Sequence, residues 1–409
     1  MITRRGLLEA AGSGAALAAS PIRLVGLSEA WAAIADLPKE LPSGTRAEAR
    51  LDALPGKKPL IKLSYRAPNY ETPLAYFRST ITPNDAFFVR YHLSNIPEVD
   101  AASWRLSVGG EGANSKFELS LDELKRMPAV EIVAVNQCSG NRRGLFQPHV
   151  AGVEWGYGAM GCARWKGARL RDVLQRLGLK REAIEIVFDG ADGPADDQTP
   201  DFVKSIPVAK ALEETTLIAY EMNGQPLPHW NGFPARLVVP GWTGTYWMKH
   251  LISVRAVIRP FDGFWMKSAY RIPTGRFPLV ARFASQETAI NIPITEMVVN
   301  SLITSPVDGA NVAVGKVVVC GLAWDGGYGI HAVEISTDGG NTWAPAQLGE
   351  DLGRFAFRPW TYEVLAKRGK NTVTARATNV VGQSQTASLI VNPAGYHHNV
   401  MQTITLSAV

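Results

Sequence analysis

Short hydrophobic runs of β type, separated by turns rich in Asn, Gly and Pro, dominate the chain up to about residue 300. Runs of this type cover residues 106–110, 185–188, 216–222, 235–239 and 251–258. They do not alternate regularly with helical segments, so a doubly wound parallel sheet is not expected. The pattern instead predicts an α+β arrangement with mixed sheets.

Two short helices are predicted within this part of the chain. Ser120 suits the N-cap of a helix that ends before Pro128, because the residue before a proline avoids helical geometry. Between Leu170 and Leu177, apolar residues recur at intervals that place them on one helix face. Gly178 follows directly and can end this second helix in a left-handed conformation.

From about residue 300 the pattern changes to short strands with a turn every eight to twelve residues or so, as in a β-sandwich. The Asp-Gly-Gly-Asn sequence at 338–341 is a strong hairpin signal, and later strands are expected at 372–377 and 386–391. We therefore predict an α+β domain over residues 33–299 and an all-β immunoglobulin-like sandwich over residues 300–409.

The first 32 residues have the character of a targeting segment. Arg4 and Arg5 precede a weakly apolar run of small residues, and Ala30-Trp31-Ala32 has the form of a cleavage site. This pattern predicts a twin-arginine export signal over residues 1–32 and a periplasmic location, with a chance Arg-Arg pair as the alternative. Residues 33 to about 70 are rich in proline, and we expect an irregular arm there.

Composition and charge narrow the class of protein. The chain has 409 residues, 46% of them hydrophobic and 19% charged, which is typical of a soluble globular protein. The formal net charge is +5, without a run of Lys and Arg that would indicate a nucleic-acid site. A moderately positive protein instead favours an encounter with an anionic substrate.

The three cysteines, Cys138, Cys162 and Cys320, do not form a CxxC pair. Zinc ribbons, iron–sulfur clusters and covalently attached haem are therefore not expected. Cys320 lies in an apolar run and is predicted to be in the core, and Cys162 is predicted to be structural.

Cys138 differs from the other two because of its surroundings. It follows a β-type run at residues 131–135 and precedes the adjacent arginines Arg142 and Arg143. A thiol beside fixed positive charge is biased toward thiolate, the form that binds a metal, and arginines can hold an oxyanion. The alternative is a small buried hydrophobic residue, which is the usual role of a lone cysteine.

A second candidate segment is Phe87-Phe88-Val89-Arg90-Tyr91-His92. In a strand, Phe88, Arg90 and His92 would share one face, so that the arginine and the histidine could reach the same anion. The alternative is the solvent-facing edge of a sheet. The Gly-x-Gly-x-x-Gly sequence at 156–161 is a weak dinucleotide signal, because it does not open a strand–helix–strand unit; we favour a glycine-rich loop that belongs to the same site as its neighbours.

These segments resemble the sulfite oxidase family of molybdenum enzymes, and within it the catalytic subunits of bacterial periplasmic sulfite dehydrogenases. The likeness rests on Gln-Cys-Ser-Gly-Asn-Arg-Arg at 137–143 and Phe-Phe-Val-Arg-Tyr-His at 87–92, and it extends through several further segments. These are 221–228, 232–236, 239–241, Lys249, and 392–396 with Asn399. The resemblance covers the chain from about residue 65 and implies a molybdenum-pterin domain followed by a dimerisation domain.

The resemblance also implies roles for individual residues. Cys138 would be the metal ligand, and Arg90, Arg143 and Tyr270 would complete a catalytic sulfite pocket. The residues implied to bind the pterin cofactor are Phe88, Val89, Arg90, Tyr91, His92, Asp192, Asn231, Arg236, Trp247, Met248 and Lys249. The chain departs from the vertebrate members of the family at Asn231, where they have a histidine, and it lacks their haem b domain; a flavin is not expected either.

The function implied by the resemblance is oxidation of sulfite to sulfate by oxo transfer at molybdenum bound to one molybdopterin. Electrons would pass singly to a c-type cytochrome, either a separate acceptor or a subunit, and the chain would form a homodimer or a heterodimer with that cytochrome. The main alternative is the sulfane dehydrogenase subunit of a thiosulfate-oxidising system. Less favoured alternatives are a reductase of the assimilatory nitrate type and an adhesion or scaffold protein with a degenerate head.

Overall fold

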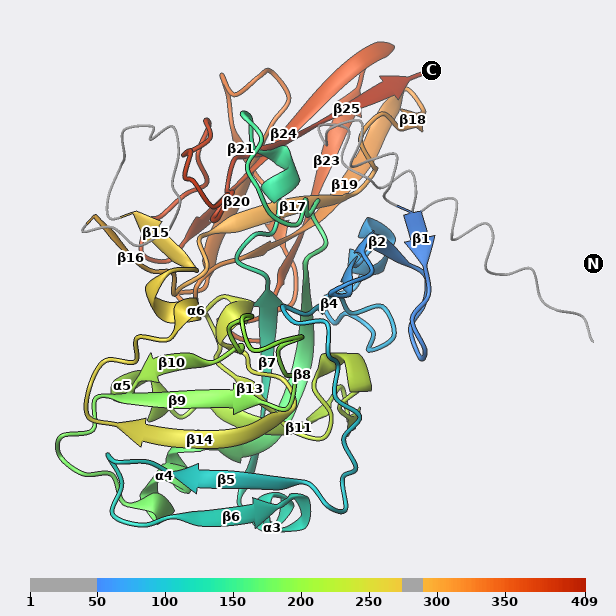
Figure 1. Cartoon of the computed structure of the whole chain (residues 1–409). Coiled ribbons are helices and arrows are strands. Elements are labelled where there is room, and N and C mark those ends of the chain that lie inside the picture. Colours follow the sequence, from blue (N-terminus) through green and yellow to red (C-terminus); the bar gives the residue numbers. More distant parts are fainter. Residues whose placement is uncertain (1–49, 274–289) are drawn as a thin grey trace, which may run out of the picture.

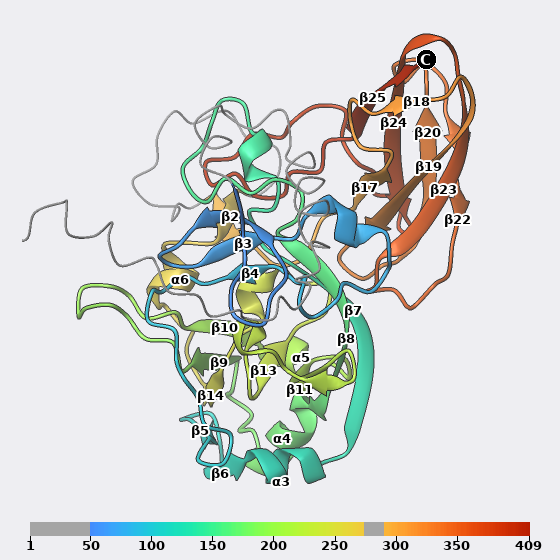
Figure 2. The ribbon, with the colours of Figure 1, turned by 90° about the vertical axis from the view of Figure 1, so that its right-hand side faces the viewer.

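The computed structural model describes residues 50–273 and 290–409, and Figure 1 shows the chain. The predicted export signal at residues 1–32 lies outside the described residues. Two regions of different architecture are visible, one built from several small sheets and helices and one built from long strands, coloured orange to red. In Figure 2 the second region stands beside the upper part of the first.

A five-stranded mixed sheet forms one side of the first region. Its order is β10 (Lys204–Pro207), β9 (Glu185–Gly190), β14 (Leu251–Val257), β5 (Arg105–Gly109) and β6 (Phe117–Ser120). Strands β14 and β5 are parallel, whereas the other neighbours are antiparallel. The predicted α+β class with mixed sheets is therefore confirmed.

A second sheet positions the cysteine loop. Its order is β12 (Gln225–Pro226), β11 (Leu217–Met222), β8 (Met160–Arg169) and β7 (Ala129–Gln137), and β13 (Arg236–Val238) also pairs with β11. Strand β7 pairs with β8 over its whole length, and Gln137 faces Met160 at the end of the ladder. Cys138 is the first residue beyond this pairing.

Both predicted helices are present. In α3 (Leu121–Arg126), Ser120 accepts a hydrogen bond from the Glu123 N–H, and the Glu123 carboxylate accepts one from the Ser120 N–H. Helix α4 (Leu170–Leu177) buries its apolar face and ends at Gly178, which has a φ of 69°. Among the described residues, the other helical elements are single turns: η1 (Leu74–Phe77), η2 (Arg143–Leu145), α5 (Val208–Ala211), η3 (His229–Asn231), η4 (Gly244–Tyr246) and α6 (Phe264–Lys267).

The prediction of an irregular arm before residue 70 is wrong for the residues that the structure describes. Strands β1 (Arg50–Asp52), β2 (Leu60–Ser64), β3 (Asn69–Glu71) and β4 (Val89–Arg90) form a small antiparallel sheet. These strands have only two to five residues each, which is too short for a clear alternating pattern. The sheet carries Arg90 next to the cysteine loop.

The second region is a sandwich of two sheets, as predicted, and is consistent with an immunoglobulin-like fold. One sheet has the order β17 (Asn300–Ser305), β19 (Gly315–Trp324), β23 (Arg358–Ala366) and β22 (Gln347–Leu348). The other has the order β18 (Asn311–Val312), β25 (Gln402–Ala408), β24 (Gly369–Asn379), β20 (Ile330–Ser336) and β21 (Ala344–Pro345). The predicted hairpin at 338–341 joins β20 and β21.

Two expectations for this sandwich are wrong. Residues 386–391 do not form a strand, because the place beside β24 is taken by β25, and only an isolated bridge joins Thr386 to Val400. Cys320 on β19 is partly exposed and not a core residue. Cys162 is fully buried, as predicted, and burial raises the pKa of its thiol to about 12.

The two regions are packed against each other through shared apolar contacts. A cluster of buried residues combines Val135, Met160 and Cys162 of the first region with Leu302 and Trp324 of the second. The predicted boundary between residues 299 and 300 stays a prediction. Ala394 and Tyr396 lie beyond it in the sequence but pack in the core of the first region. Strands β15 (Arg271–Pro273) and β16 (Asn291–Pro293) pair between the two.

Within residues 50–273 and 290–409, none of the helices has the length and apolar character that a membrane crossing requires.

Candidate active site

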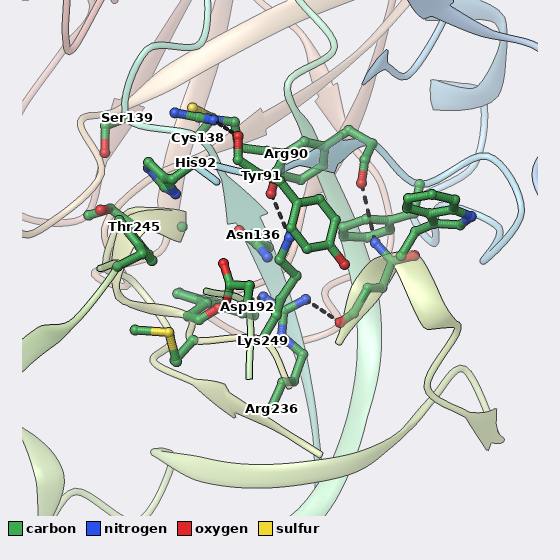
Figure 3. Close-up of a pocket in the computed structure, with 18 of the residues that line it drawn as sticks. Arg90, Tyr91, His92, Asn136, Cys138, Ser139, Asp192, Arg236, Thr245 and Lys249 are labelled. Atoms are coloured by element: carbon green, nitrogen blue, oxygen red, sulfur yellow. Dashed lines mark hydrogen bonds between the residues drawn. The ribbon is translucent and has the colours of Figure 1, made fainter. Parts of the chain in front are cut away.

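A cavity lies where the ends of β4 and β7 meet the turns before β13 and β14, with about 620 Å³ of space not filled by atoms, part of it open to solvent. Figure 3 shows it with Cys138, Arg90 and His92 at one end and Arg236 at the other. Most of the predicted site residues line it: Phe88, Arg90, Tyr91, His92, Cys138, Asp192, Asn231, Arg236, Trp247, Met248, Lys249 and Tyr270.

Cys138 is held at the cavity wall by its backbone. Its N–H donates to the Ala159 carbonyl at 2.9 Å, and its own carbonyl accepts from the Asn141 N–H at 2.9 Å. The side chain is 7% exposed, so the sulfur meets the cavity but little bulk solvent. A thiolate in such a setting is suited to a single soft metal ligand bond.

Arg90, His92 and Tyr270 meet beside the cysteine. Arg90 Nη2 donates to the Tyr270 hydroxyl at 3.4 Å, and His92 Nε2 is in close hydrogen-bond contact with the same hydroxyl. The His92 ring stacks on Phe202 with the ring centroids 3.6 Å apart. Two polar groups that are two residues apart in the sequence therefore converge on the phenol oxygen of a residue from a distant part of the chain.

The charges of this group follow from burial and from proximity. Burial lowers the pKa of His92 well below its usual value, and neighbouring Arg90 lowers it further, so this imidazole is neutral. Burial alone would lower the pKa of Arg90, but nearby Tyr270 and Cys138 raise it, and the net shift is upward. Burial raises the pKa of Tyr270, so its hydroxyl keeps its proton. The result is one fixed cation beside two neutral polar groups.

The opposite end of the cavity holds a buried arginine and a half-buried lysine. Arg236 donates to the backbone carbonyls of Asn231 and Trp247, each at 2.9 Å, and Lys249 Nζ donates to the Arg90 carbonyl at 2.6 Å. Burial lowers the pKa of Arg236 to about 9 and the pKa of Lys249 well below its usual value, although Asp192 opposes the shift at Lys249.

Asn231, the position that departs from the vertebrate pattern, is held by its own hydrogen bonds. Its side-chain oxygen accepts from Lys57 Nζ at 2.6 Å, and its amide nitrogen donates to the Phe88 carbonyl at 3.2 Å. Lys57 is buried, and burial lowers its pKa to about 7. Lys57 was missed by the sequence analysis because it lies in the part of the chain that was expected to be irregular.

Two predicted site residues do not line the cavity. Val89 is buried in a separate apolar cluster of the small N-terminal sheet, on the face opposite Arg90. Arg143 donates through Nε to the Ala394 carbonyl at 2.9 Å, and its guanidinium lies 5.2 Å from the ring centroid of Tyr396. Its hydrogen bonds therefore go to backbone carbonyls near the cavity and not into the cavity.

Several lining residues were not predicted: Phe87, Asn136, Ser139, Phe202, Trp230, Gly244 and Thr245. Gly244 approaches the cysteine loop so closely that an added Cβ would lie 2.4 Å from Asn136 Oδ1. Asn136 and Ser139 lie within two residues of Cys138, and this closeness in sequence is the signal that could have placed them in the site. The predicted glycine-rich loop at 156–161 does not line the cavity; its Gly156 and Gly158 N–H groups donate to Glu71.

The residues present fit a molybdenum-pterin group with a phosphate. Arg236 is a buried cation without a carboxylate salt bridge in the described part of the chain, and half-buried Lys249 lies beside it, so an anion would compensate their charge. Asn136 Oδ1, Thr245 Oγ1 and Arg236 Nε are buried polar atoms that line the cavity or border it and lack a hydrogen-bond partner there. The thiol of Cys138 lies at the other end, as a metal ligand requires.

The sequence matches two family models. One, the oxidoreductase molybdopterin binding domain, matches residues 92–265, and the other, the Mo-co oxidoreductase dimerisation domain, matches residues 291–408. The chain is also similar in fold to the sulfane dehydrogenase SoxCD from Paracoccus pantotrophus, with a TM-score of 0.73 and 23% identity over 90% of this chain and 91% of that one.

Proteins of similar sequence include several sulfite oxidases. The chain is 35% identical over 348 residues to mitochondrial sulfite oxidase of Rattus norvegicus, which covers 83% of this chain and 62% of that protein. It is 37% identical over 347 residues to sulfite oxidase of Gallus gallus, which covers 81% of this chain and 74% of that protein. The chain thus spans about 60% of the length of the rat protein. The protein belongs to the sulfite oxidase family of molybdenum enzymes.

Proposed function

We propose that the protein oxidises sulfite to sulfate, with electrons passed to a c-type cytochrome. The observation that carries this proposal is the convergence of Cys138, Arg90 and Tyr270 on one end of the cavity. Oxidation of sulfite takes an oxygen atom from water and releases two electrons and two protons, so the enzyme needs a redox group and an anion site side by side. The cavity offers residues for both.

Cys138 is proposed to bind the metal as thiolate. When bound, the molybdenum-pterin group supplies oxygen-atom transfer and accepts the two electrons. Arg90 supplies a fixed positive charge for the sulfite oxygens, and Tyr270 supplies a neutral hydroxyl donor beside it. His92 orients the Tyr270 hydroxyl through its ring nitrogen.

At the other end, Arg236 and Lys249 are proposed to hold the phosphate of the cofactor, since Arg236 is a buried cation without a carboxylate salt bridge in the described part of the chain and the Lys249 amine lies close to it. Asp192 lies between the two ends and suits the N–H donors of a pterin ring (Figure 3). The length of the cavity thereby separates the negatively charged tail of the cofactor from the substrate anion.

The predicted export signal supports a periplasmic location, where a c-type cytochrome would act as acceptor or subunit. The family model over residues 291–408 supports assembly through the second region, either as a homodimer or as a heterodimer with that cytochrome. Size-exclusion chromatography with light scattering of the purified protein tests this assembly.

The proposed reaction is tested with the purified protein loaded with molybdenum. Sulfite should reduce cytochrome c at a steady rate, and Cys138→Ser should abolish that rate because the metal loses its protein ligand. Cys320→Ser is the matched control, since Cys320 lies on β19 of the sandwich and should leave the rate unchanged. Sulfite oxidation by the Cys138→Ser variant would refute the proposed role of the thiol.

A sulfane dehydrogenase activity on a carrier-bound substrate is the alternative, and the same assay separates the two. The sulfur end of the cavity favours a small oxyanion, because Cys138 is 7% exposed and Tyr270 is 6% exposed. A substrate attached to a carrier protein needs a more open approach. Turnover of a carrier-bound persulfide in the absence of sulfite turnover would replace the first proposal by the second.

A further inference from the structure

Tyr270 has a backbone conformation that its neighbours must hold in place. Its φ of 56° lies in the left-handed region, which residues with a Cβ rarely occupy and which persists only when the surroundings enforce it. Its carbonyl accepts a hydrogen bond from the Ile294 N–H at 2.8 Å. This bond holds the backbone, and Arg90 and His92 contact the hydroxyl, but neither packs against the flat face of the ring between them.

The ring of Tyr270 is held by a tyrosine of the second region. Tyr396 stacks on it with the ring centroids 5.5 Å apart and an angle of 10° between the planes. Both rings are almost completely buried. Offset stacking of this kind is an attractive and directional contact, so it favours one orientation of the Tyr270 ring.

Tyr396 is itself fixed from within its own turn. The Asn392 side chain accepts a hydrogen bond from the Tyr396 N–H at 2.9 Å and donates one to the Tyr396 carbonyl at 2.7 Å. Gly395, with a φ of 62°, allows the turn to approach the cysteine loop, because an added Cβ would lie 2.8 Å from Arg143 Cγ. The turn therefore holds Tyr396 in one position against the cysteine loop.

Arg143 completes the arrangement next to the same turn. Its guanidinium lies 5.2 Å from the Tyr396 ring centroid, and its Nε bonds the Ala394 carbonyl at 2.9 Å. The order Tyr270, Tyr396, Arg143 thus runs outward from the cavity. Figure 2 shows the red segment of the second region beside the teal loop that follows β7.

We propose that Tyr396 is a positioning residue for Tyr270, and that the oxyanion site is therefore completed by the second region of the chain. Tyr396 does not line the cavity, so it acts through Tyr270. The inference rests on the proposed function only in taking sulfite as the anion; the contact between the two rings does not depend on it.

The first test is structural and needs no substrate. Crystal structures of Tyr396→Ala and Tyr396→Phe are compared with that of the unaltered protein. In Tyr396→Ala the Tyr270 hydroxyl should leave its place between Arg90 and His92, and in Tyr396→Phe, which keeps the stacked ring, it should stay. An unmoved Tyr270 in Tyr396→Ala, or equal displacement in both variants, would overturn the proposal.

The second test is kinetic and uses the molybdenum-loaded protein. Tyr396→Ala should raise the KM for sulfite by about three- to tenfold, the range that an aromatic stacking pair corresponds to, with a smaller change in kcat. Tyr396→Phe should stay within about twofold of the unaltered protein. Tyr328→Ala is the matched control, because Tyr328 is an exposed tyrosine of the same region. A KM unchanged in Tyr396→Ala, or raised equally in Tyr328→Ala, would count against the proposal.

The two tests separate this inference from the proposed reaction. If the unaltered protein does not oxidise sulfite but Tyr270 still moves in Tyr396→Ala, the proposed reaction fails and the positioning role stands. If sulfite oxidation is found and Tyr270 does not move, the positioning role fails alone. Molybdenum content and the melting temperature of each variant are measured to confirm that the protein is folded and loaded.

Discussion

Arg142 Nη1 donates a hydrogen bond of 2.6 Å to Asn300 Oδ1, and this bond joins the cysteine loop to the first strand of the sandwich. Arg142 Nη2 donates to the Ser301 carbonyl at 2.7 Å. The side chain is 1% exposed, and burial lowers its pKa to about 10, so it stays charged at neutral pH. A charged side chain is thus buried at the junction, with neutral oxygens as its acceptors.

Replacement of this arginine should weaken the junction. Arg142→Gln is expected to lower the free energy of unfolding by about 2–3 kcal/mol, the loss that accompanies removal of a hydrogen bond from a charged donor. Urea denaturation followed by tryptophan fluorescence measures it. Arg181→Gln, at an exposed position, is the control and should change little. Equal stability of the two variants would contradict the role of Arg142.

Arg90 should contribute mainly to binding of the substrate anion. Arg90→Gln removes the fixed positive charge beside Tyr270, so we expect the KM for sulfite to rise by about 10- to 100-fold, since a charge-assisted hydrogen bond contributes about 1.5–3 kcal/mol. Steady-state kinetics with sulfite measures the change, and Arg105→Gln on the exposed face of β5 is the control. A fall in kcat with an unchanged KM would argue against anion binding by Arg90.

Arg236 should matter for retention of the cofactor. Arg236→Gln removes a buried cation from the end of the cavity assigned to the phosphate, so the ratio of molybdenum to protein after size-exclusion chromatography should fall well below that of the unaltered protein. Arg255→Gln, at an exposed position of β14, should retain the metal. Full molybdenum content in Arg236→Gln would remove the phosphate role.

Glu71 should give the stability of the protein a distinctive dependence on pH. Burial raises its pKa to about 7, although the N–H groups of Gly156 and Gly158 oppose this shift, so the folded protein holds a proton that the unfolded chain releases at lower pH. Between about pH 4.5 and pH 7 the folded state therefore binds more protons, and stability from this group falls as pH rises.

A comparison with Glu71→Gln separates this effect from that of the other titratable groups. The stability advantage of the unaltered protein over the variant should shrink as pH rises from about 5 to about 7 and then remain level. Urea denaturation at a series of pH values measures the difference. An advantage that stays level over this interval would show that burial does not raise the pKa of Glu71.

Features that depend on neighbours in sequence could be predicted, and features that depend on distant contacts could not. The helix that begins after Ser120 and the strand β7 that ends just before Cys138 follow from caps and apolar patterns within a few residues. The hydrogen bonds of Arg143 were not predictable in this way, because its partner Ala394 lies 251 residues further along the chain. The family motif indicated that Arg143 is near the site, but not its direction.

The segment at 386–391 illustrates the same limit. Its sequence is of β type, yet whether a run becomes a strand depends on an available partner edge, and β25 occupies that edge. For the short strands β1 to β3 the prediction was wrong in the opposite way, because strands formed where none was expected. They have weak local patterns but gain hydrogen bonds from one another and from β4.

The contact between Arg143 and Ala394 also has a consequence for how the protein is made. A ribosome that adds about 5–20 residues per second needs roughly 13–50 s to travel from one residue to the other. During that interval the nascent cysteine loop already exists without the turn that covers it. The contacts of Tyr396 and Arg143 across the two regions can therefore form only after the whole first region has been synthesised.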